Sequence, residues 1–200
     1  MSDLFFRSEL IGPVRVLRLL SPDGTNRLTL ACVSAFTDIL RENARSPEPL
    51  VVTGNDNYFS AGADLREIRR LDGVAARDFS RRGQQLMDAI ESFPAPVYAV
   101  VSGYCLGGGL DLALACHHRI ATPSALFGHR GASLGLVTGW GGTQRLPRLI
   151  GKAAALSMFM CAGRVDAEKA LQFGLIDGIA EDPVADAVLR IETGYAGRKR

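Results

Sequence analysis

Cysteine is scarce in this chain, and its cysteines form no recognisable motif. Cys32, Cys105, Cys116 and Cys161 are far apart, and no CxxC pair occurs. This spacing argues against a zinc site or a disulfide framework. Cys116 precedes two histidines, but adjacent residues of a helix or strand point in different directions, and no second cluster completes a ligand set. We therefore expect no metal ion and no disulfide, and the cytoplasm as the compartment.

Long hydrophobic runs and a large excess of one charge are also missing. The first ten residues contain no basic start followed by an apolar run, and Gly, Asp or Arg interrupts the long apolar stretches. We therefore expect neither a signal peptide nor a membrane span. The formal net charge is +2, and the basic residues are scattered apart from a short run at 198–200, which we expect to be a solvated tail. We expect no nucleic-acid partner.

The phosphate-binding motifs of nucleotide-binding proteins are absent as well. The sequence holds no GxxxxGK[ST] motif, and the run GGGLDLA lacks the GxGxxG frame of a dinucleotide site. In those motifs, glycines at fixed spacing bring backbone N–H groups to the phosphates. We therefore expect no nucleotide cofactor.

The elements that are present alternate between strands and helices. Apolar residues at helical spacing predict helices over 28–43, 66–71, 75–93, 110–115, 139–150, 152–161, 166–173 and 183–195. Short apolar runs predict strands over 14–19, 50–53, 97–101, 119–121 and 125–128, with a last strand after 177. This order indicates an α/β fold, and 200 residues with 47% hydrophobic content suit one domain over 1–200.

The stretch 97–116 carries the first candidate site. A β-branched run ends at Val101, three glycines follow at 107–109, and strong helix formers begin at Leu110. Glycine lets a ligand approach the backbone, and the unpaired N–H groups of a helix start favour negative charge. Two interpretations stay open. The turn binds an oxyanion, or it is a tight strand-to-helix turn in which Asp111 caps the helix.

A second turn of small residues lies at 58–65. Gly62 is surrounded by Ser60, Ala61 and Ala63, directly before a charged helical segment. One interpretation is a loop in which Asp64 caps that helix. The other is a second place where backbone N–H groups face a ligand.

Three glycine-rich motifs in this order resemble the crotonase superfamily, the enoyl-CoA hydratase/isomerase family. They are FSAGADL at 59–65, GYCLGGGLDLA at 103–113 and GWGGTQRLP at 139–147, and segment 163–177 also matches. The resemblance covers about residues 14–181, which we expect to be the core of the domain. It implies a spiral of repeated ββα units, assembled as a homotrimer or hexamer. The helix at 183–195 leaves the chain short for this family.

The resemblance also implies an acyl-CoA thioester as substrate, with no separate cofactor because coenzyme A is part of the substrate. In the family, two backbone N–H groups polarise the thioester carbonyl and stabilise an enolate, since fixed donors in a dry site stabilise developing charge. Carried over by motif, these N–H groups belong to Ala63 and Gly108. The residues expected to line the substrate are Ala61, Gly62, Asp64, Leu65, Gly107, Gly131 and Trp140.

Only one of the two carboxylates used by hydratases of this family is present. Asp111 takes the place of the first, usually a glutamate, and we expect it to shuttle a proton. The position of the second falls on Gly131, which carries no acid. His129 is a possible replacement base, because histidine titrates near neutrality. The interpretation that we prefer is a loop histidine satisfied by the backbone.

Two functions from different classes follow. The first is an acyl-CoA enzyme of this family, in which double-bond isomerisation is favoured over hydration because it needs a single acid. The second is a non-catalytic acyl-CoA-binding or assembly subunit, which would keep the backbone donors and tolerate the loss of an acid. A serine hydrolase on the related Clp-protease-like fold ranks last, because it needs a Ser/His/acid set, and we expect no GxSxG or comparable nucleophile elbow in this chain.

Overall fold

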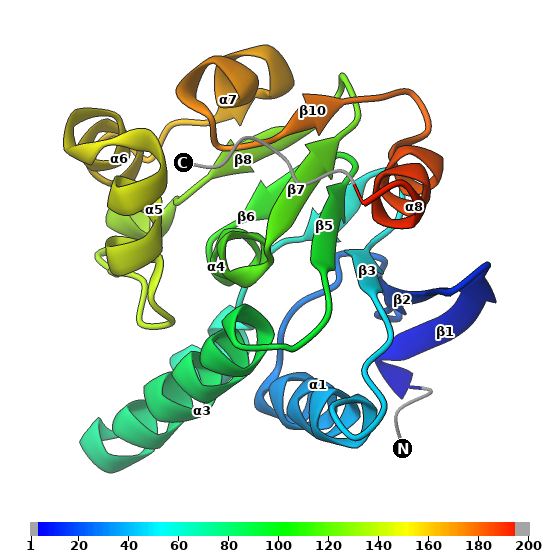
Figure 1. Cartoon of the computed structure of the whole chain (residues 1–200). Coiled ribbons are helices and arrows are strands. Elements are labelled where there is room, and N and C mark those ends of the chain that lie inside the picture. The colour runs from blue at the N-terminus through cyan, green and yellow to red at the C-terminus, as the bar shows by residue number, and fades with distance from the viewer. Residues whose placement is uncertain (1–3, 195–200) are drawn as a thin grey trace.

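The computed structural model describes residues 4–194 and contains two β-sheets with helices packed around them (Figure 1). The larger sheet has the order β1 (Phe6–Ile11), β2 (Val14–Leu19), β3 (Leu50–Thr53), β5 (Val97–Val101), β7 (His118–Ala121) and β10 (Gly178–Ile179). The smaller sheet has the order β4 (Tyr58–Ser60), β6 (Tyr104–Leu106), β8 (Leu126–Gly128) and β9 (Val165–Asp166).

The helices follow the strands in a regular way. They are α1 (Leu30–Asn43), α2 (Leu65–Ile68), α3 (Gly73–Glu91), α4 (Gly108–Ala115), α5 (Gly142–Ile150), α6 (Lys152–Met160), α7 (Ala167–Phe173) and α8 (Pro183–Glu192), with the 3-10 helix η2 (Gly131–Leu134). A strand of the larger sheet, a strand of the smaller sheet and a helix recur as β3–β4–α3, β5–β6–α4 and β7–β8–α5. Successive repeats pair in parallel in both sheets, which is the expected spiral of ββα units.

Strand β5 lies at the centre of the larger sheet and is buried along its whole length, as predicted. Its side chains alternate between two cores because successive residues of a strand point to opposite faces. Val97, Ala99 and Val101 belong to the main core with α1, α3 and α4. Tyr98 and Val100 face a smaller core that α8 covers. Figure 1 shows α8 apart from the helices that cover the other face.

Four strands were not predicted, among them β9, whose two residues precede α7 directly and pair with β8. The predictions missed β1, in which five of the six residues are exposed, because such an edge strand owes its form to antiparallel pairing with β2. They also missed β4 and β6, which have three residues each and lie beside glycine turns. The chain therefore passes through the second sheet between β5 and α4. The last helix ends at Glu192, and the end predicted for it at 195 lies outside the described residues, as does the basic run 198–200.

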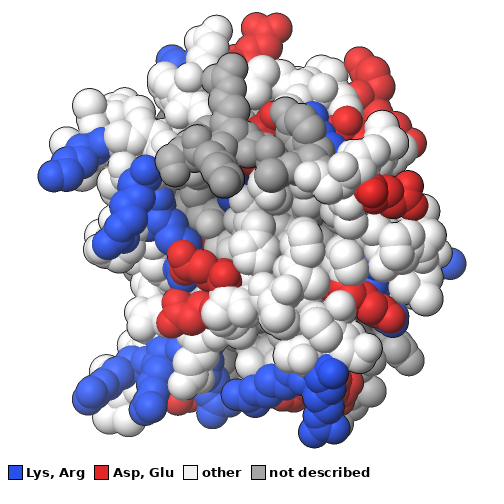
Figure 2. Space-filling model, viewed as in Figure 1, with Lys and Arg blue, Asp and Glu red and all other residues white. Residues whose placement is uncertain are grey.

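Charged side chains are spread over the surface in groups. On the face shown in Figure 2, lysines and arginines gather over α1 and α3 at the lower margin and over α5 and α6 at the left, with acidic residues beside them. Within residues 4–194, no helix combines the length and the apolar character that crossing a membrane requires.

Candidate active site

The turn after β4 leaves one backbone N–H group free. The N–H groups of Ala61, Gly62 and Asp64 donate to acceptors in neighbouring loops and in Ser60, at 2.9, 3.0 and 3.3 Å. Ala63 pairs with Leu28 as an isolated parallel bridge. In this geometry the hydrogen bonds to Leu28 are made by Gly62 and Asp64, which flank Ala63. Among the described residues, the Ala63 N–H group has no acceptor.

The start of α4 presents a second free N–H group beside the first. The N–H group of Gly107 donates to the Gly128 carbonyl at 2.9 Å, and the Gly107 carbonyl accepts from Asp111 at 3.0 Å. Gly108, the first residue of α4, donates to no acceptor in the described part of the chain. An ideal Cβ on Gly108 would lie only 3.2 Å from the Ala63 nitrogen, so the two loops are in contact. Two unpaired donors from separate loops thus lie side by side.

Gly62 allows this close approach. Its φ of +96° is a left-handed conformation that residues with a side chain rarely adopt. A Cβ there would lie 2.7 Å from the Leu106 carbonyl oxygen and 3.0 Å from the Gly108 nitrogen. Any side chain at Gly62 would therefore push the two donors apart.

Asp111 lies one turn into α4 and is 1% exposed. Its Oδ2 accepts a hydrogen bond from the Thr138 hydroxyl, and its Oδ1 is 3.1 Å from His129 Nε2. The interpretation of Asp111 as the helix cap is wrong, because the N-cap residue is Gly107 and no side chain caps α4. The carboxylate instead faces groups that come from two other segments of the chain.

His129 is a partner of Asp111 in space and is 3% exposed. Its ring centroid is 5.0 Å from that of Phe159 on α6. Its Nε2 and Asp111 Oδ1 are aligned too poorly for a hydrogen bond, and neither atom has another polar partner in residues 4–194. The preferred interpretation of a histidine satisfied by the backbone is therefore wrong. Among residues 4–194, these two buried atoms therefore have only each other as polar neighbours.

Gly142, the first residue of α5, closes this pair from one side. A Cβ built on Gly142 would overlap Asp111 Oδ1 and would lie 3.0 Å from His129 Nε2. Neither Thr138 nor Gly142 was singled out in the sequence. Their only signal was the third glycine motif, which Thr138 directly precedes and which contains Gly142.

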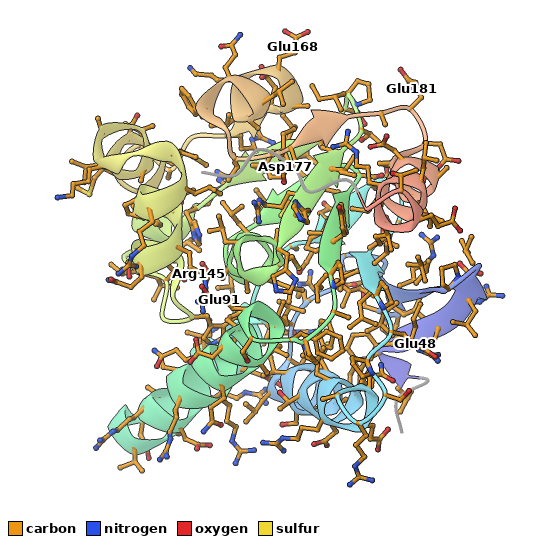
Figure 3. All side chains as sticks on the ribbon, in the orientation of Figure 1. Glu48, Glu91, Arg145, Glu168, Asp177 and Glu181 are labelled. Carbon is orange, nitrogen blue, oxygen red and sulfur yellow. The ribbon has the colours of Figure 1, made fainter. Side chains whose placement is uncertain are left out.

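Trp140 lies against Gly108, whose N–H group is the second of the two free donors. Its indole is 3% exposed, packs on Gly108 and donates from Nε1 to the Phe79 carbonyl of α3 at 3.3 Å. Arg145 of α5 holds the same loop to α3, since its guanidinium is 2.6 Å from Glu91 and 3.4 Å from the Trp140 carbonyl. Figure 3 shows Arg145 and Glu91 close together between these two helices.

Three further residues expected to line the substrate are Asp64 and Leu65, at the start of α2, and Gly131, in η2. Leu65 is half exposed, at 50%, while the Asp64 side chain is buried and caps α2 by accepting from the Arg66 N–H, so that the N-cap interpretation is confirmed. The hydrogen bond from the Arg66 side chain lowers the pKa of Asp64 to about 2. Gly131 lies in η2, where a Cβ would be 2.6 Å from the Leu136 carbonyl oxygen, so a larger residue there would need this turn to shift.

A serine-hydrolase elbow does not form. The expectation that the chain lacks a GxSxG motif is wrong, because residues 131–135 read GASLG and match that spacing. Ser133, however, lies in η2 on the surface, and its hydroxyl donates to the Arg130 carbonyl at 2.8 Å. The motif requires a sharp turn from a strand to an α-helix. The match is therefore one of spacing alone.

The histidines after Cys116 have other partners. His117 Nδ1 accepts from the Val97 N–H at 2.9 Å, and its Nε2 contacts the Glu91 carbonyl at 3.2 Å. The His118 ring stacks on Tyr98 at 4.6 Å between centroids. In residues 4–194, no group of three or more His, Cys, Asp or Glu residues is placed to hold a metal ion.

A ββα spiral with two glycine-rich loops in contact defines a protein of the crotonase fold, and comparison with known proteins agrees. A family model described as "Enoyl-CoA hydratase/isomerase" matches residues 11–193. The chain therefore belongs to the enoyl-CoA hydratase/isomerase family.

Individual relatives show the same likeness. A probable enoyl-CoA hydratase of Bacillus subtilis (strain 168) is 44% identical over 134 residues, which are 66% of this chain and 52% of that relative. The chain thus matches about half the length of this curated relative. The structure of Pseudomonas aeruginosa DspI superposes with a TM-score of 0.89 at 33% identity, covering 94% of this chain and 73% of DspI. An enoyl-CoA hydratase from Bacillus anthracis gives 0.89 at 31% identity, with 94% and 75% covered.

Proposed function

We propose that the protein processes acyl-CoA thioesters and that the N–H groups of Ala63 and Gly108 bind the thioester carbonyl oxygen. The observation that carries this proposal is the meeting of two unpaired N–H groups from separate loops. Such fixed donors stabilise the charge that develops on one oxygen when a carbanion forms beside a carbonyl. Family membership supports the same substrate class.

The favoured reaction is movement of a double bond. Asp111 takes the α-proton of a β,γ-unsaturated thioester, and the electron pair moves onto the carbonyl oxygen between the two donors. The resulting dienolate then receives the same proton at its γ-carbon and leaves as the α,β-unsaturated thioester. One carboxylate suffices for both transfers. Hydration needs a second group to position water, and Gly131 offers no side chain for this role.

A second candidate is a binding subunit without turnover. It is favoured by the surroundings of Asp111, because Thr138 engages one carboxylate oxygen and His129 faces the other. If the carboxylate remains in this buried arrangement, the backbone donors would bind a thioester from which no base removes a proton. Self-association as a trimer or hexamer, and the cytoplasm as compartment, are further parts of the proposal.

The test uses the single tryptophan of the chain, which packs on one of the proposed donors. Its fluorescence is titrated with butyryl-CoA, free butyrate and free coenzyme A, and calorimetry repeats each titration. A panel of enoyl-, dienoyl- and hydroxyacyl-CoA thioesters is then assayed for turnover. We expect thioesters to bind more tightly than free acids, and isomerisation to be faster than hydration. Binding without any turnover would favour the binding subunit, and no binding of any thioester would refute both functions.

A further inference from the structure

The indole of Trp140 bridges the two helices beside the proposed oxyanion site. A Cβ on Gly83 of α3 would overlap the pyrrole edge of the ring. A Cβ on Gly108 of α4 would lie 2.6 Å from Cζ3 on the opposite edge. The ring therefore fills a slot that exists only because both positions lack a side chain.

Several contacts fix the ring in this slot. It packs on Phe79 with 5.1 Å between centroids, and its Nε1 donates to the Phe79 carbonyl at 3.3 Å. The Arg145 guanidinium, held by Asp88 and Glu91 at 2.8 and 2.6 Å, lies 3.4 Å from the Trp140 carbonyl. Both the side chain and the backbone of Trp140 are thus tied to α3 or to partners on it.

The residues that line the neighbouring cavity are polar, charged or glycine. This cavity of about 550 Å³ is lined by Gly139 and Gly141 of the Trp140 loop and by residues of α3 and α5. These residues include Gln84, Asp88, Glu91 and Arg148, and the indole is not part of the lining. Burying an acyl chain against such groups would remove them from water without replacing their hydrogen bonds.

We propose that Trp140 is the wall that limits the acyl group, so that the site accepts short acyl thioesters and rejects long ones. A carbonyl oxygen held by the Ala63 and Gly108 N–H groups places the acyl group next to the ring edge that rests on Gly108. Because the ring is fixed on three sides, a longer chain has to displace it. The inference rests on the proposed acyl-CoA function and assigns that site its substrate class.

The test compares affinities along a series of saturated thioesters. Butyryl-, hexanoyl-, octanoyl- and decanoyl-CoA are titrated by calorimetry into the wild type, Trp140→Phe and Trp140→Ala. We expect the wild type to bind octanoyl-CoA at least about tenfold more weakly than butyryl-CoA, since even one misplaced methylene can cost about tenfold in a fitted pocket. In Trp140→Ala the ratio should move at least about tenfold toward the long chain. The ratio for Trp140→Phe should lie between those of the wild type and Trp140→Ala. This milder variant should fold even if Trp140→Ala does not.

Phe36→Leu is the matched control, because Phe36 is fully buried in α1 and packs on Phe6 in a different part of the core. It should lower stability and leave the chain-length ratio unchanged. Octanoyl-CoA binding to the wild type as tightly as butyryl-CoA or more tightly would overturn the inference and leave the proposed function standing. The same chain-length ratio in the wild type and Trp140→Phe would do so too. If neither the wild type nor any Trp140 variant binds a thioester, the proposed function is refuted together with it. If only the variants bind, Trp140 is a plug and the short-chain preference is wrong.

Discussion

Asp111 and its neighbours define the chemistry available to single residues. The carboxylate is buried, accepts from the Thr138 hydroxyl and faces the His129 imidazole. A general base must reach the proton that it takes, although such contacts often tighten only when substrate binds. If Asp111 is the base, substrate binding has to draw one of its oxygens away from its present partners. Otherwise Asp111 takes no part in proton transfer.

Asp111→Asn separates these two possibilities. The amide keeps the shape of the side chain and cannot accept a proton, so turnover should fall by at least roughly a hundredfold. The affinity for butyryl-CoA should stay nearly unchanged, because the proposed function assigns binding of the oxygen to the backbone donors. Steady-state kinetics and calorimetry measure the two effects. Full activity of this variant would remove Asp111 from the proton-transfer role.

His129 gives a second prediction at the residue scale. We expect His129→Ala to lower turnover about tenfold or more with little change in affinity, because Asp111 loses the only imidazole beside Oδ1 and its position loosens. His129→Gln, which keeps an N–H donor of similar reach, should recover much of the loss if His129 positions Asp111. A dead His129→Gln together with an active Asp111→Asn would make His129 the base.

At the scale of elements, the larger sheet carries a pH-sensitive contact. His118 opens β7, stacks on Tyr98 of β5 and lies 3.9 Å from Asp177, just before β10. Figure 3 labels Asp177 beside this part of the sheet. Burial lowers the pKa of His118 from its ordinary 6.5, against the attraction of Asp177 and with smaller contributions from Arg119, His117 and Arg190. The folded state therefore favours the neutral imidazole.

The sign of the pH effect follows from this lowered pKa. The unfolded chain binds the proton more readily, so the contribution of His118 to stability is fully present above pH 6.5 and is lost as the pH falls toward the folded-state pKa. Urea unfolding of the wild type should show a lower midpoint at about pH 5 than at about pH 7. His118→Gln cannot take up this proton and should show a smaller decline. Equal declines in both proteins would contradict the prediction.

At the scale of the whole molecule, η2 and α6, which contact each other beside His129, carry exposed apolar side chains, here called the apolar surface. Leu134 and Val137 lie in and after η2, and Leu156 and Met160 lie on α6. Their exposed fractions are 57%, 80%, 61% and 70%. Exposed apolar groups gathered in one region mark interaction surfaces in soluble proteins. We predict that this surface contributes to a trimer or hexamer.

Light scattering at micromolar concentration tests the assembly. The wild type should have the mass of a trimer or hexamer, and Leu156→Glu should lower that mass because a charge cannot be buried unpaired. Leu189→Glu is the control, since Leu189 is 58% exposed on α8, at a distance along the chain from the apolar surface. A monomeric wild type, or equal effects of the two variants, would show that this surface is not the interface.

The sequence by itself determined the local features of this protein. The apolar run of β5 dictates a buried strand, and Asp64 caps α2 because its carboxylate reaches an N–H group only two residues away. The glycine motifs at 59–65 and 103–113 also placed two backbone turns correctly, because a turn without side chains is a property of its own residues.

Only the tertiary structure decided which side chains meet. Asp111, His129 and Thr138 come from three places in the chain, and nothing in their own segments says that they face one another. The same holds for Trp140, whose position depends on glycines of two different helices, and for β1, which is a strand because β2 pairs with it. The physical reason is that the stacking of successive ββα units sets these contacts, and stacking depends on how distant surfaces fit when the core closes.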